Sequence, residues 1–207
     1  MEIQYFGANC VRLSTKKASI VIDDNLSEVG LKSITKSDEI ALYTRPESRE
    51  SGAKHTIDQP GEYEVSDTSI QGISVKAHSE GEETPKSTIF KIIAEDIRVV
   101  ALGHISPELD DNQLERIGTV DVMILPVGGG GYTLNPTEAL KVIKKIGPKI
   151  IIPTHYNDKS IKYPEPQVDL AEAIKELAME PTETVPKLKL KSTEIAEVTQ
   201  LIVLERQ

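Results

Sequence analysis

The stretch that decides the fold spans residues 121–156, DVMILPVGGGGYTLNPTEALKVIKKIGPKIIIPTHY. It carries two apolar runs, 120–127 and 148–155, on either side of a segment, 136–147, with apolar residues at helical spacing. Strands that are apolar on both faces are typical of a parallel sheet covered by helices. The stretch therefore predicts a strand, a helix and a parallel strand, in that order.

The ends of the central helix are marked by residues with defined conformational preferences. Asn135 is a good N-cap, Pro136 suits the first helical position, and Glu138 completes a capping box. Gly147 and Pro148 stop the helix because glycine favours the position after the last turn and proline cannot continue it.

Before residue 108 the chain consists mostly of short runs rich in β-branched residues, separated by turns, which predicts strands. The expected strands are 3–6, 10–13, 19–23, 39–44, 60–65, 68–75, 87–94 and 97–102. A Pro-Gly turn signal places 60–65 in a hairpin, and the polar, acidic segment 79–87 is expected to be a mobile loop.

After residue 108 helical patterns alternate with strands. Further helices are expected at 108–118 and 168–179, and two further strands within 187–205. The apolar runs are too continuous for a sheet that is exposed on one face. The sequence therefore predicts an α/β fold of two packed sheets with helices outside. We expect one domain over 1–207, since no repeat and no linker divides the chain.

Composition narrows the class of protein. The chain has 24 basic and 33 acidic residues, a net charge of −9 that disfavours general binding to nucleic acid. Cys10 is the only cysteine, which excludes an intrachain disulfide and a thiolate zinc site and fits a reducing compartment. No leader pattern and no apolar run of about 20 residues occurs, so we expect a soluble, cytoplasmic protein without a membrane segment.

Three of the four histidines follow apolar strands directly. ISVKAH, VVALGH and IIIPTH end in His78, His104 and His155, at the strand ends where α/β folds gather functional side chains. One alternative is that each is a partly buried histidine bonded to nearby backbone. The other is that the three converge on one pocket. His55 lies in a polar stretch and is expected on the surface.

Together with four other segments, the opening stretch resembles the metallo-β-lactamase superfamily. The segments are IQYFGANCVRL (3–13), SIVID (19–23), QPGEYEV (59–65) and VPKLKLKSTEI (185–195). The chain is similar in particular to the branch of small predicted metal-dependent hydrolases that includes the ascorbate-phosphate lactonases. The resemblance runs from Ile3 to Glu205 and implies an αββα sandwich, two mixed β-sheets flanked by helices.

The resemblance also implies a site for one or two divalent metals, commonly zinc or manganese, at the rim between the sheets. The main metal motif of the family, HxHxDH, falls on residues 45–50, directly after Thr44. Its four ligand positions are occupied here by Arg45, Glu47, Arg49 and Glu50.

The other implied positions are partly kept. The middle and late histidines of the family correspond to His78 and His155, and its Gly-Asp pair corresponds to Gly103 and His104. An N-terminal Gly-His pair of this branch is replaced by Gly7 and Ala8, and Asp23 matches an aspartate that orients a metal-binding histidine in the family.

The substituted motif decides between two functions. Guanidinium is not a metal ligand and keeps its charge, so a dinuclear centre is not expected. The leading hypothesis is a non-catalytic homologue without cofactor, in which Arg45 and Arg49 pair with Glu47 and Glu50 and the pocket binds a small molecule or a protein partner.

The alternative is a mononuclear hydrolase of a small phosphorylated or lactone-like substrate. In that case His78, His104 and His155, with Glu47 or Glu50, would hold one zinc or manganese ion. The glycine loop 128–131 is either an anion cradle or a flexible connection, and Tyr132 after it is a candidate ligand contact. An oligomer remains possible under both alternatives.

Overall fold

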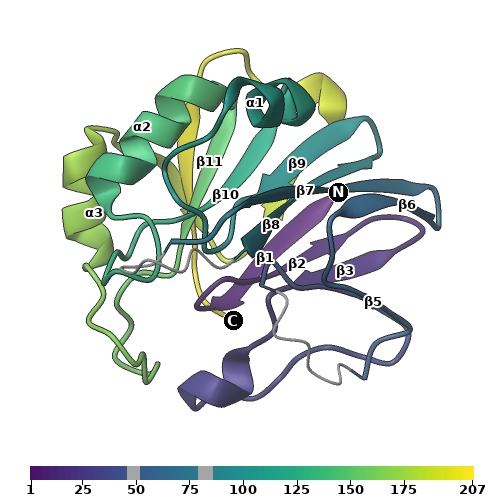
Figure 1. Ribbon diagram of the computed structural model, residues 1–207, viewed down its shortest axis with the longest axis horizontal. Coiled ribbons are helices and arrows are strands. Elements are labelled where there is room, and N and C mark those ends of the chain that lie inside the picture. Colours follow the sequence, from purple (N-terminus) through teal and green to yellow (C-terminus); the bar gives the residue numbers. More distant parts are fainter. Residues whose placement is uncertain (46–51, 79–85) are drawn as a thin grey trace.

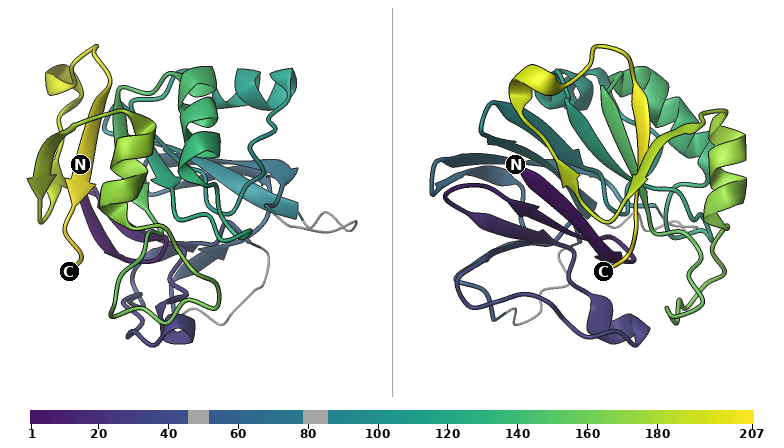
Figure 2. Two further views of the ribbon diagram at one scale, coloured as in Figure 1. Left: turned by 90° about the vertical axis from the view of Figure 1, so that its left-hand side faces the viewer. Right: turned by 180° about the vertical axis from the view of Figure 1, so that it is seen from behind.

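The computed structural model describes residues 1–45, 52–78 and 86–207. Three of the motif residues singled out from the sequence, Glu47, Arg49 and Glu50, lie outside the described residues, as does most of the predicted loop 79–87. Within the described chain the strands form two sheets that face each other (Figures 1 and 2). The expected α/β sandwich of two mixed sheets is confirmed.

The smaller sheet has six strands in the order β13-β1-β2-β3-β4-β5 in the described part of the chain. Their bounds are β1 (Glu2–Gly7), β2 (Cys10–Ser14), β3 (Ser19–Ile22), β4 (Ile40–Leu42), β5 (His55–Ile57) and β13 (Leu188–Lys189). Strands β1 to β3 are antiparallel, and β3, β4 and β5 are parallel.

The larger sheet has eight strands in the order β12-β14-β11-β10-β9-β8-β7-β6, again within the described residues. Their bounds are β6 (Gly61–Val65), β7 (Thr68–Lys76), β8 (Lys86–Ala94), β9 (Ile97–Ala101), β10 (Val122–Pro126), β11 (Ile150–Thr154), β12 (Pro181–Val185) and β14 (Gln200–Leu204). Strands β6 to β9 form an antiparallel meander that includes the predicted hairpin, and the strands from β9 through β10, β11 and β14 to β12 are joined in parallel.

Helices cover the outer face of the larger sheet (Figure 1). They are α1 (Asp111–Ile117), α2 (Pro136–Ile146) and α3 (Leu170–Leu177). The outer face of the smaller sheet is covered in part by the 3-10 helix η1 (Leu26–Val29), whose Leu26 packs on Cys10 and Val21. A second 3-10 helix, η2 (Ser192–Glu194), precedes β14. Among the described helices none is long and apolar enough to cross a bilayer.

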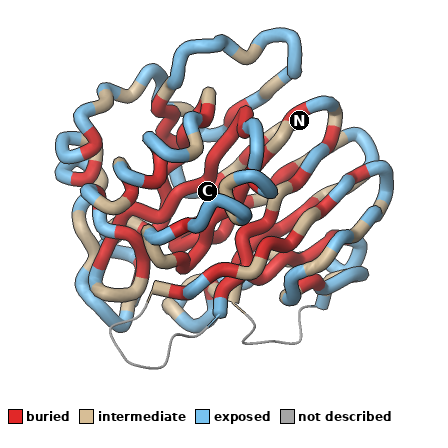
Figure 3. Tube along the Cα trace, turned by 45° about the horizontal axis from the view of Figure 1, so that its top comes forward, coloured by how far each residue is buried: buried red, intermediate tan, exposed pale blue. Residues whose placement is uncertain are grey.

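The main core lies between the two sheets. Buried segments follow the strands through the interior of the molecule (Figure 3). Tyr5 and Phe90 are the largest fully buried side chains of this core, and aliphatic residues supply the rest. Full burial of each aliphatic side chain contributes about 1.5–3 kcal/mol. Because β10 and β11 are buried along their whole length, they fix the edge at which the candidate site is built.

The predicted capping box of α2 is confirmed. The Glu138 amide donates to Asn135 Oδ1 and the Asn135 amide donates to Glu138 Oε2, both at 2.9 Å, and Gly147 ends the helix in the left-handed region. The helices predicted at 108–118 and 168–179 are shorter than expected, because Asp110 and Asp169 are N-caps in extended conformation.

Replacement of Asn135 with alanine is expected to lower the free energy of unfolding by about 1 kcal/mol, the usual effect of losing an N-cap. Asn112, an exposed asparagine inside α1, is the matched control, and its alanine variant should be neutral or slightly stabilised. Urea denaturation of both variants measures the difference. Equal losses in the two would contradict the capping role.

Two strands were missed from the sequence. Strand β12, PTETV, is largely exposed and has no apolar run, so no periodicity marks it. It forms because it pairs in parallel with the buried strand β14. Strand β5 is three residues long and pairs with β4 in the same way. In both cases the neighbouring strand, and not the local sequence, determines the conformation.

Candidate functional site

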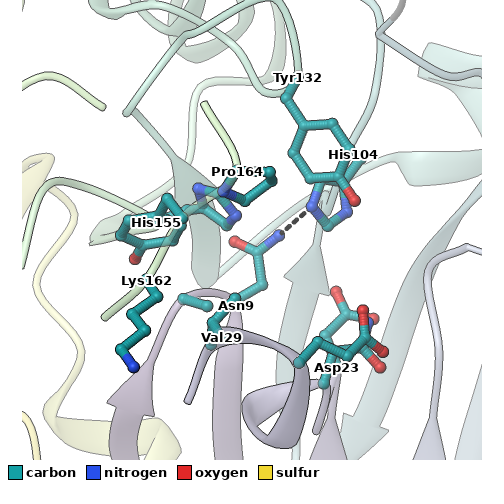
Figure 4. Close-up of a pocket in the computed structure, with 12 residues that line it drawn as sticks. Asn9, Asp23, Val29, His104, Tyr132, His155, Lys162 and Pro164 are labelled. Carbon is teal, nitrogen blue, oxygen red and sulfur yellow. Dashed lines mark hydrogen bonds between the residues drawn. The ribbon is translucent and has the colours of Figure 1, made fainter. Parts of the chain in front are cut away.

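The candidate site lies where the ends of several strands meet. Strands β9 and β11 run in parallel with β10 and deliver His104 and His155 to the same edge. The smaller sheet contributes Asn9, from the turn between β1 and β2, and Asp23, directly after β3. Figure 4 shows the side chains of His104, His155 and Asn9 around one space, with Tyr132 and Asp23 at its margins.

These strand ends enclose a cavity of about 300 Å³. Its lining consists of Ala8, Asn9, Asp23, Asn25, Glu28, Val29, His104, Tyr132, His155, Lys162, Tyr163 and Pro164. A volume of this size is at the lower end of the range for small-molecule sites. The polar groups at its base are buried, since Asn9 and Asp23 are each only 3% exposed.

His155 is held in one orientation by a side-chain amide. Its Nδ1 lies 3.0 Å from Gln167 Oε1, while Gln167 Nε2 donates to the carbonyl of Glu165 at 3.0 Å. Because the amide nitrogen of Gln167 is engaged elsewhere, its oxygen accepts a hydrogen bond from His155 Nδ1–H, and His155 Nε2 is left as an acceptor. Burial lowers the pKa of His155 to about 4, although the bond to Gln167 acts in the opposite direction.

His104 is also buried and is bonded through its other nitrogen. Asn9 Nδ2 lies 3.4 Å from His104 Nε2, and Asn9 Oδ1 accepts a hydrogen bond from Thr154 Oγ1 at 3.1 Å. Burial lowers the pKa of His104 well below its usual value, and the charge of Arg45 and any proton on His155 act in the same direction. His104 Nδ1 is buried and has no hydrogen-bond partner among the described residues. The imidazole is therefore neutral at physiological pH.

Asp23 binds Thr44, just after the end of β4, and does not orient a histidine. The amide of Thr44 donates to Asp23 Oδ1 and its hydroxyl donates to Oδ2, both at 2.7 Å. Burial raises the pKa of Asp23 to about 6, against the two Thr44 bonds and the nearby charge of Arg45, which lower it. Gly103 fits tightly against Thr44, since a Cβ at this position would lie 2.2 Å from Thr44 Oγ1.

The glycine loop is shaped by its contact with the end of β11. A Cβ on Gly128 would lie 2.0 Å from the carbonyl oxygen of His155, so only glycine fits beside that backbone. Gly129 donates its amide to Leu134 O and to Thr133 Oγ1 within the loop. The loop thereby places Tyr132 in edge contact with His104, with ring centroids 4.5 Å apart.

The candidate residues do not all gather in the cavity. His104, His155 and Tyr132 line it, and the Arg45 guanidinium lies 4.9 Å from the centre of the Tyr132 ring. His78 does not line it, because His78 Nε2 lies 3.1 Å from Glu138 Oε2, the carboxylate that also caps α2. The acid candidates Glu47 and Glu50, with Arg49, lie outside the described residues.

Several cavity residues were not found from the sequence. Asn9 follows Gly7 and Ala8, where the only signal was an altered Gly-His pair. Lys162 and Tyr163, which line the cavity, and Gln167, which contacts His155, come from the segment after β11, whose composition carries no signal for a site. They reach the cavity because this segment folds back, with the Lys162 amide bonded to Val29 O and the Val168 amide bonded to Gly128 O.

The described residues do not fit an ordinary metal site. In this part of the chain no three His, Cys, Asp or Glu side chains are arranged to hold a metal ion. His104 and His155 face each other with ring centroids 5.4 Å apart, but the guanidinium beside Tyr132 adds positive charge that disfavours a dication.

Comparison with known proteins gives the family. The family model for a beta-lactamase superfamily domain matches residues 2–155. A "UPF0173 metal-dependent hydrolase" of Enterococcus faecalis is 26% identical over 155 residues, which cover 71% of this chain and 66% of that protein. Another "UPF0173 metal-dependent hydrolase", of Thermofilum pendens, is 31% identical over 116 residues, which cover 56% of this chain and 47% of that protein. The matches thus span two thirds or less of these relatives.

Solved structures agree in fold. A metallo-β-lactamase superfamily protein of Thermotoga maritima, assigned as a zinc-dependent hydrolase, superposes with a TM-score of 0.76 at 27% identity and covers 100% of this chain and 99% of its own. A metallo hydrolase of Ignicoccus hospitalis superposes with a TM-score of 0.63 at 20% identity, over 99% of this chain and 94% of that protein, and shows the fold alone. Since the family model spans most of the chain and the two-sheet architecture matches, the chain belongs to the metallo-β-lactamase superfamily.

Proposed function

We propose that this chain is a non-catalytic member of the superfamily that binds a small molecule in the cavity without a metal ion. The observation that carries the proposal is the position of Arg45. Its guanidinium stacks on Tyr132, at the wall of the cavity, and the two histidines beside it are buried and neutral. The guanidinium adds positive charge beside these histidines, which supports a site without a divalent metal ion.

The shape of the site favours a small molecule over a protein partner. The lining comes from both sheets and from the segment after β11, so the cavity is a recess between layers and not a flat face. Its aromatic rings supply apolar contact, while buried Asn9 and Asp23 supply polar contacts that fix orientation. The hydrolase names of the relatives describe those proteins, and for this chain they support only the competing alternative.

The competing alternative is a mononuclear metal-dependent hydrolase. One observation favours it: His155 donates Nδ1–H to Gln167 and keeps Nε2 as an acceptor, which is the arrangement of many metal-binding histidines. A metal would still need further ligands, and His78, whose Nε2 lies 3.1 Å from Glu138 Oε2, does not line the cavity.

Elemental analysis separates the two functions. We expect protein purified without chelators, then incubated with excess zinc or manganese and desalted, to retain well under one metal ion per chain, because the described donors do not form a site. The His155→Ala variant is the control for bound metal. About one ion per chain in the parent protein, absent from His155→Ala, would overturn the proposal and establish the hydrolase alternative.

A further inference from the structure

His155 presents a hydrogen-bond acceptor to the cavity. Its Nδ1–H donates to Gln167 Oε1 at 3.0 Å, and Gln167 does not line the cavity, so this side of the ring faces the outer wall. Nε2, on the other side of the ring, bonds to no other described residue, and it is not among the buried side-chain atoms of the described chain that lack a partner. It therefore keeps accessible surface, and because His155 lines the cavity this acceptor is open to a ligand.

His104 offers the same cavity ring surface but no free nitrogen. Its Nε2 lies 3.4 Å from Asn9 Nδ2, whose amide oxygen accepts from Thr154, and its Nδ1 is buried. Of the two imidazoles that line the space in Figure 4, only His155 can thus bond a ligand through a ring nitrogen. A ligand that uses this nitrogen must donate the hydrogen bond.

The amide that fixes this acceptor is itself held in place. Gln167 Nε2 donates to Glu165 O at 3.0 Å. The amide also lies against the glycine loop, where a Cβ on Gly128 would come within 2.2 Å of Gln167 Oε1 and a Cβ on Gly130 within 3.0 Å of Gln167 Nε2. The glycines therefore leave the room that Gln167 needs to set the tautomer of His155.

The backbone of His155 is in an uncommon conformation. Its φ is +53°, in the left-handed region that residues other than glycine rarely adopt. The His155 amide donates to Ala8 O at 2.8 Å, which ties the end of β11 to the turn between β1 and β2. Strained positions of this kind cluster at ligand sites, so the conformation supports a role of His155 in binding.

The groups at the cavity favour a neutral ligand. Burial lowers the pKa of His155 to about 4, so the ring accepts a hydrogen bond without taking up the donated proton. The described charged residues that line the cavity or contact its rings balance, with two acids and two bases: Asp23, Glu28, Lys162 and Arg45. Such a set gives no strong preference for an anion or a cation.

Flat rings surround the acceptor. His155 lies against Tyr163 with ring centroids 4.8 Å apart, and His104 lies against Tyr132 at 4.5 Å. Pro164 completes this part of the lining. Aromatic walls of this kind pack best on a planar ring, and the cavity of about 300 Å³ suits a compact one.

We propose that the ligand is a neutral aromatic alcohol, a planar ring that carries a phenol-type hydroxyl group. The hydroxyl donates to His155 Nε2, and the ring packs against the aromatic walls. A phenolic hydroxyl is more acidic than an aliphatic one and is therefore the stronger donor. This inference rests on the proposed function, since a metal ion bound to His155 would occupy the same nitrogen. Gln167 is then a positioning residue, which sets the tautomer of His155 without contacting the ligand.

The binding probe is 2-naphthol, with 2-methoxynaphthalene as the matched compound that lacks the O–H donor. The chain has no tryptophan, so naphthalene fluorescence excited beyond the tyrosine band reports binding without protein background. We expect saturable binding of 2-naphthol and about tenfold weaker binding of the methoxy compound, the loss for one hydrogen bond left unmade. Equal binding of the two compounds, or no binding of 2-naphthol, would overturn the inference.

The His155→Leu variant separates the hydrogen bond from the extra bulk of the methyl group. It removes the acceptor, so the preference for 2-naphthol over 2-methoxynaphthalene should disappear. A preference that comes from bulk alone would persist in this variant, and that result would contradict the proposed bond.

Gln167→Leu tests the same bond without changing a residue that lines the cavity, and it serves also if His155→Leu does not fold. Long-range ¹H–¹⁵N correlation spectra should show a protonated Nδ1 and an unprotonated Nε2 on His155 in the parent, and exchange between tautomers in the variant. Binding of 2-naphthol should weaken about two- to fivefold, because only part of the population keeps Nε2 free, while binding of 2-methoxynaphthalene should not change.

Gln71→Leu, on β7 and away from the cavity, is the matched control and should change neither the spectra nor the binding. A protonated Nε2 on His155 in the parent would overturn the inference. So would unchanged binding of 2-naphthol by a Gln167→Leu variant whose tautomers exchange.

The metal measurement keeps the two proposals apart. Stoichiometric metal would remove the proposed function, and the ligand inference with it. A metal-free protein that does not bind 2-naphthol, or that binds both compounds equally, would retain the metal-free site and remove only the inferred ligand class.

Discussion

Gly103→Ala is expected to destabilise the fold strongly, with a loss of about 2–5 kcal/mol in the free energy of unfolding. Gly103 has φ of +61°, and a Cβ at this position would lie 2.2 Å from Thr44 Oγ1 and 2.4 Å from Thr44 Cβ. The left-handed conformation alone costs an alanine about 1–2 kcal/mol, and overpacking against a buried neighbour adds about 1–3 kcal/mol. Thr44 is not free to move aside, because Asp23 accepts from both its amide and its hydroxyl.

Gly147→Ala is the matched control for this experiment. Gly147 has nearly the same φ, +64°, but nothing lies within 4 Å of the Cβ that it would gain. Gly147→Ala should lower the free energy of unfolding by only about 1 kcal/mol, because only the strained backbone conformation contributes. Thermal melts should place the melting temperature about 10 °C lower for Gly103→Ala and about 3 °C lower for Gly147→Ala. Equal shifts would mean that Thr44 and Asp23 rearrange at little cost.

The second large effect is on the pH dependence of stability. Burial lowers the pKa of His155 from 6.5 to about 4, so the unfolded chain binds a proton at this residue more readily than the folded chain. Between about pH 6.5 and pH 4 the unfolded state is therefore favoured increasingly as pH falls. The contribution of neutral His155 to the free energy of unfolding is fully present above about pH 6.5. As the pH falls to about 4, this contribution should decrease by about 3 kcal/mol.

The difference between the parent and His155→Gln isolates this contribution. Asp23, whose raised pKa acts in the opposite direction over part of this range, is present in both proteins, so its effect largely cancels in the comparison. Urea denaturation at about pH 7 and about pH 4 should show the parent losing about 3 kcal/mol more than the variant. His55→Gln, at an exposed position, should follow the parent at both pH values. A parallel loss in parent and His155→Gln would show that His155 is not the group responsible.

The fold could be predicted wherever local signals and burial agree. In the stretch 121–156 the apolar runs, the helical spacing and the cap at Asn135 all indicate the same elements, and β10, α2 and β11 are present as expected. Prediction failed where a neighbour decides the conformation, as in the exposed strand β12.

The site was predictable in part. The strand ends and the family resemblance placed His104 and His155, which do line one cavity. The same reasoning grouped His78 with them, yet its partner is Glu138, a residue that the sequence identifies only as part of a helix cap. Gln167 and Asn9 could not be found in this way, because their role depends on which nitrogen of a distant imidazole they contact.

The double use of Glu138 links a helix start to a strand end. The carboxylate that accepts from the Asn135 amide at the start of α2 also lies 3.1 Å from His78 Nε2, two residues after β7. A substitution of Glu138 therefore removes two connections at once, and it should loosen the end of β7 as well as the first turn of α2.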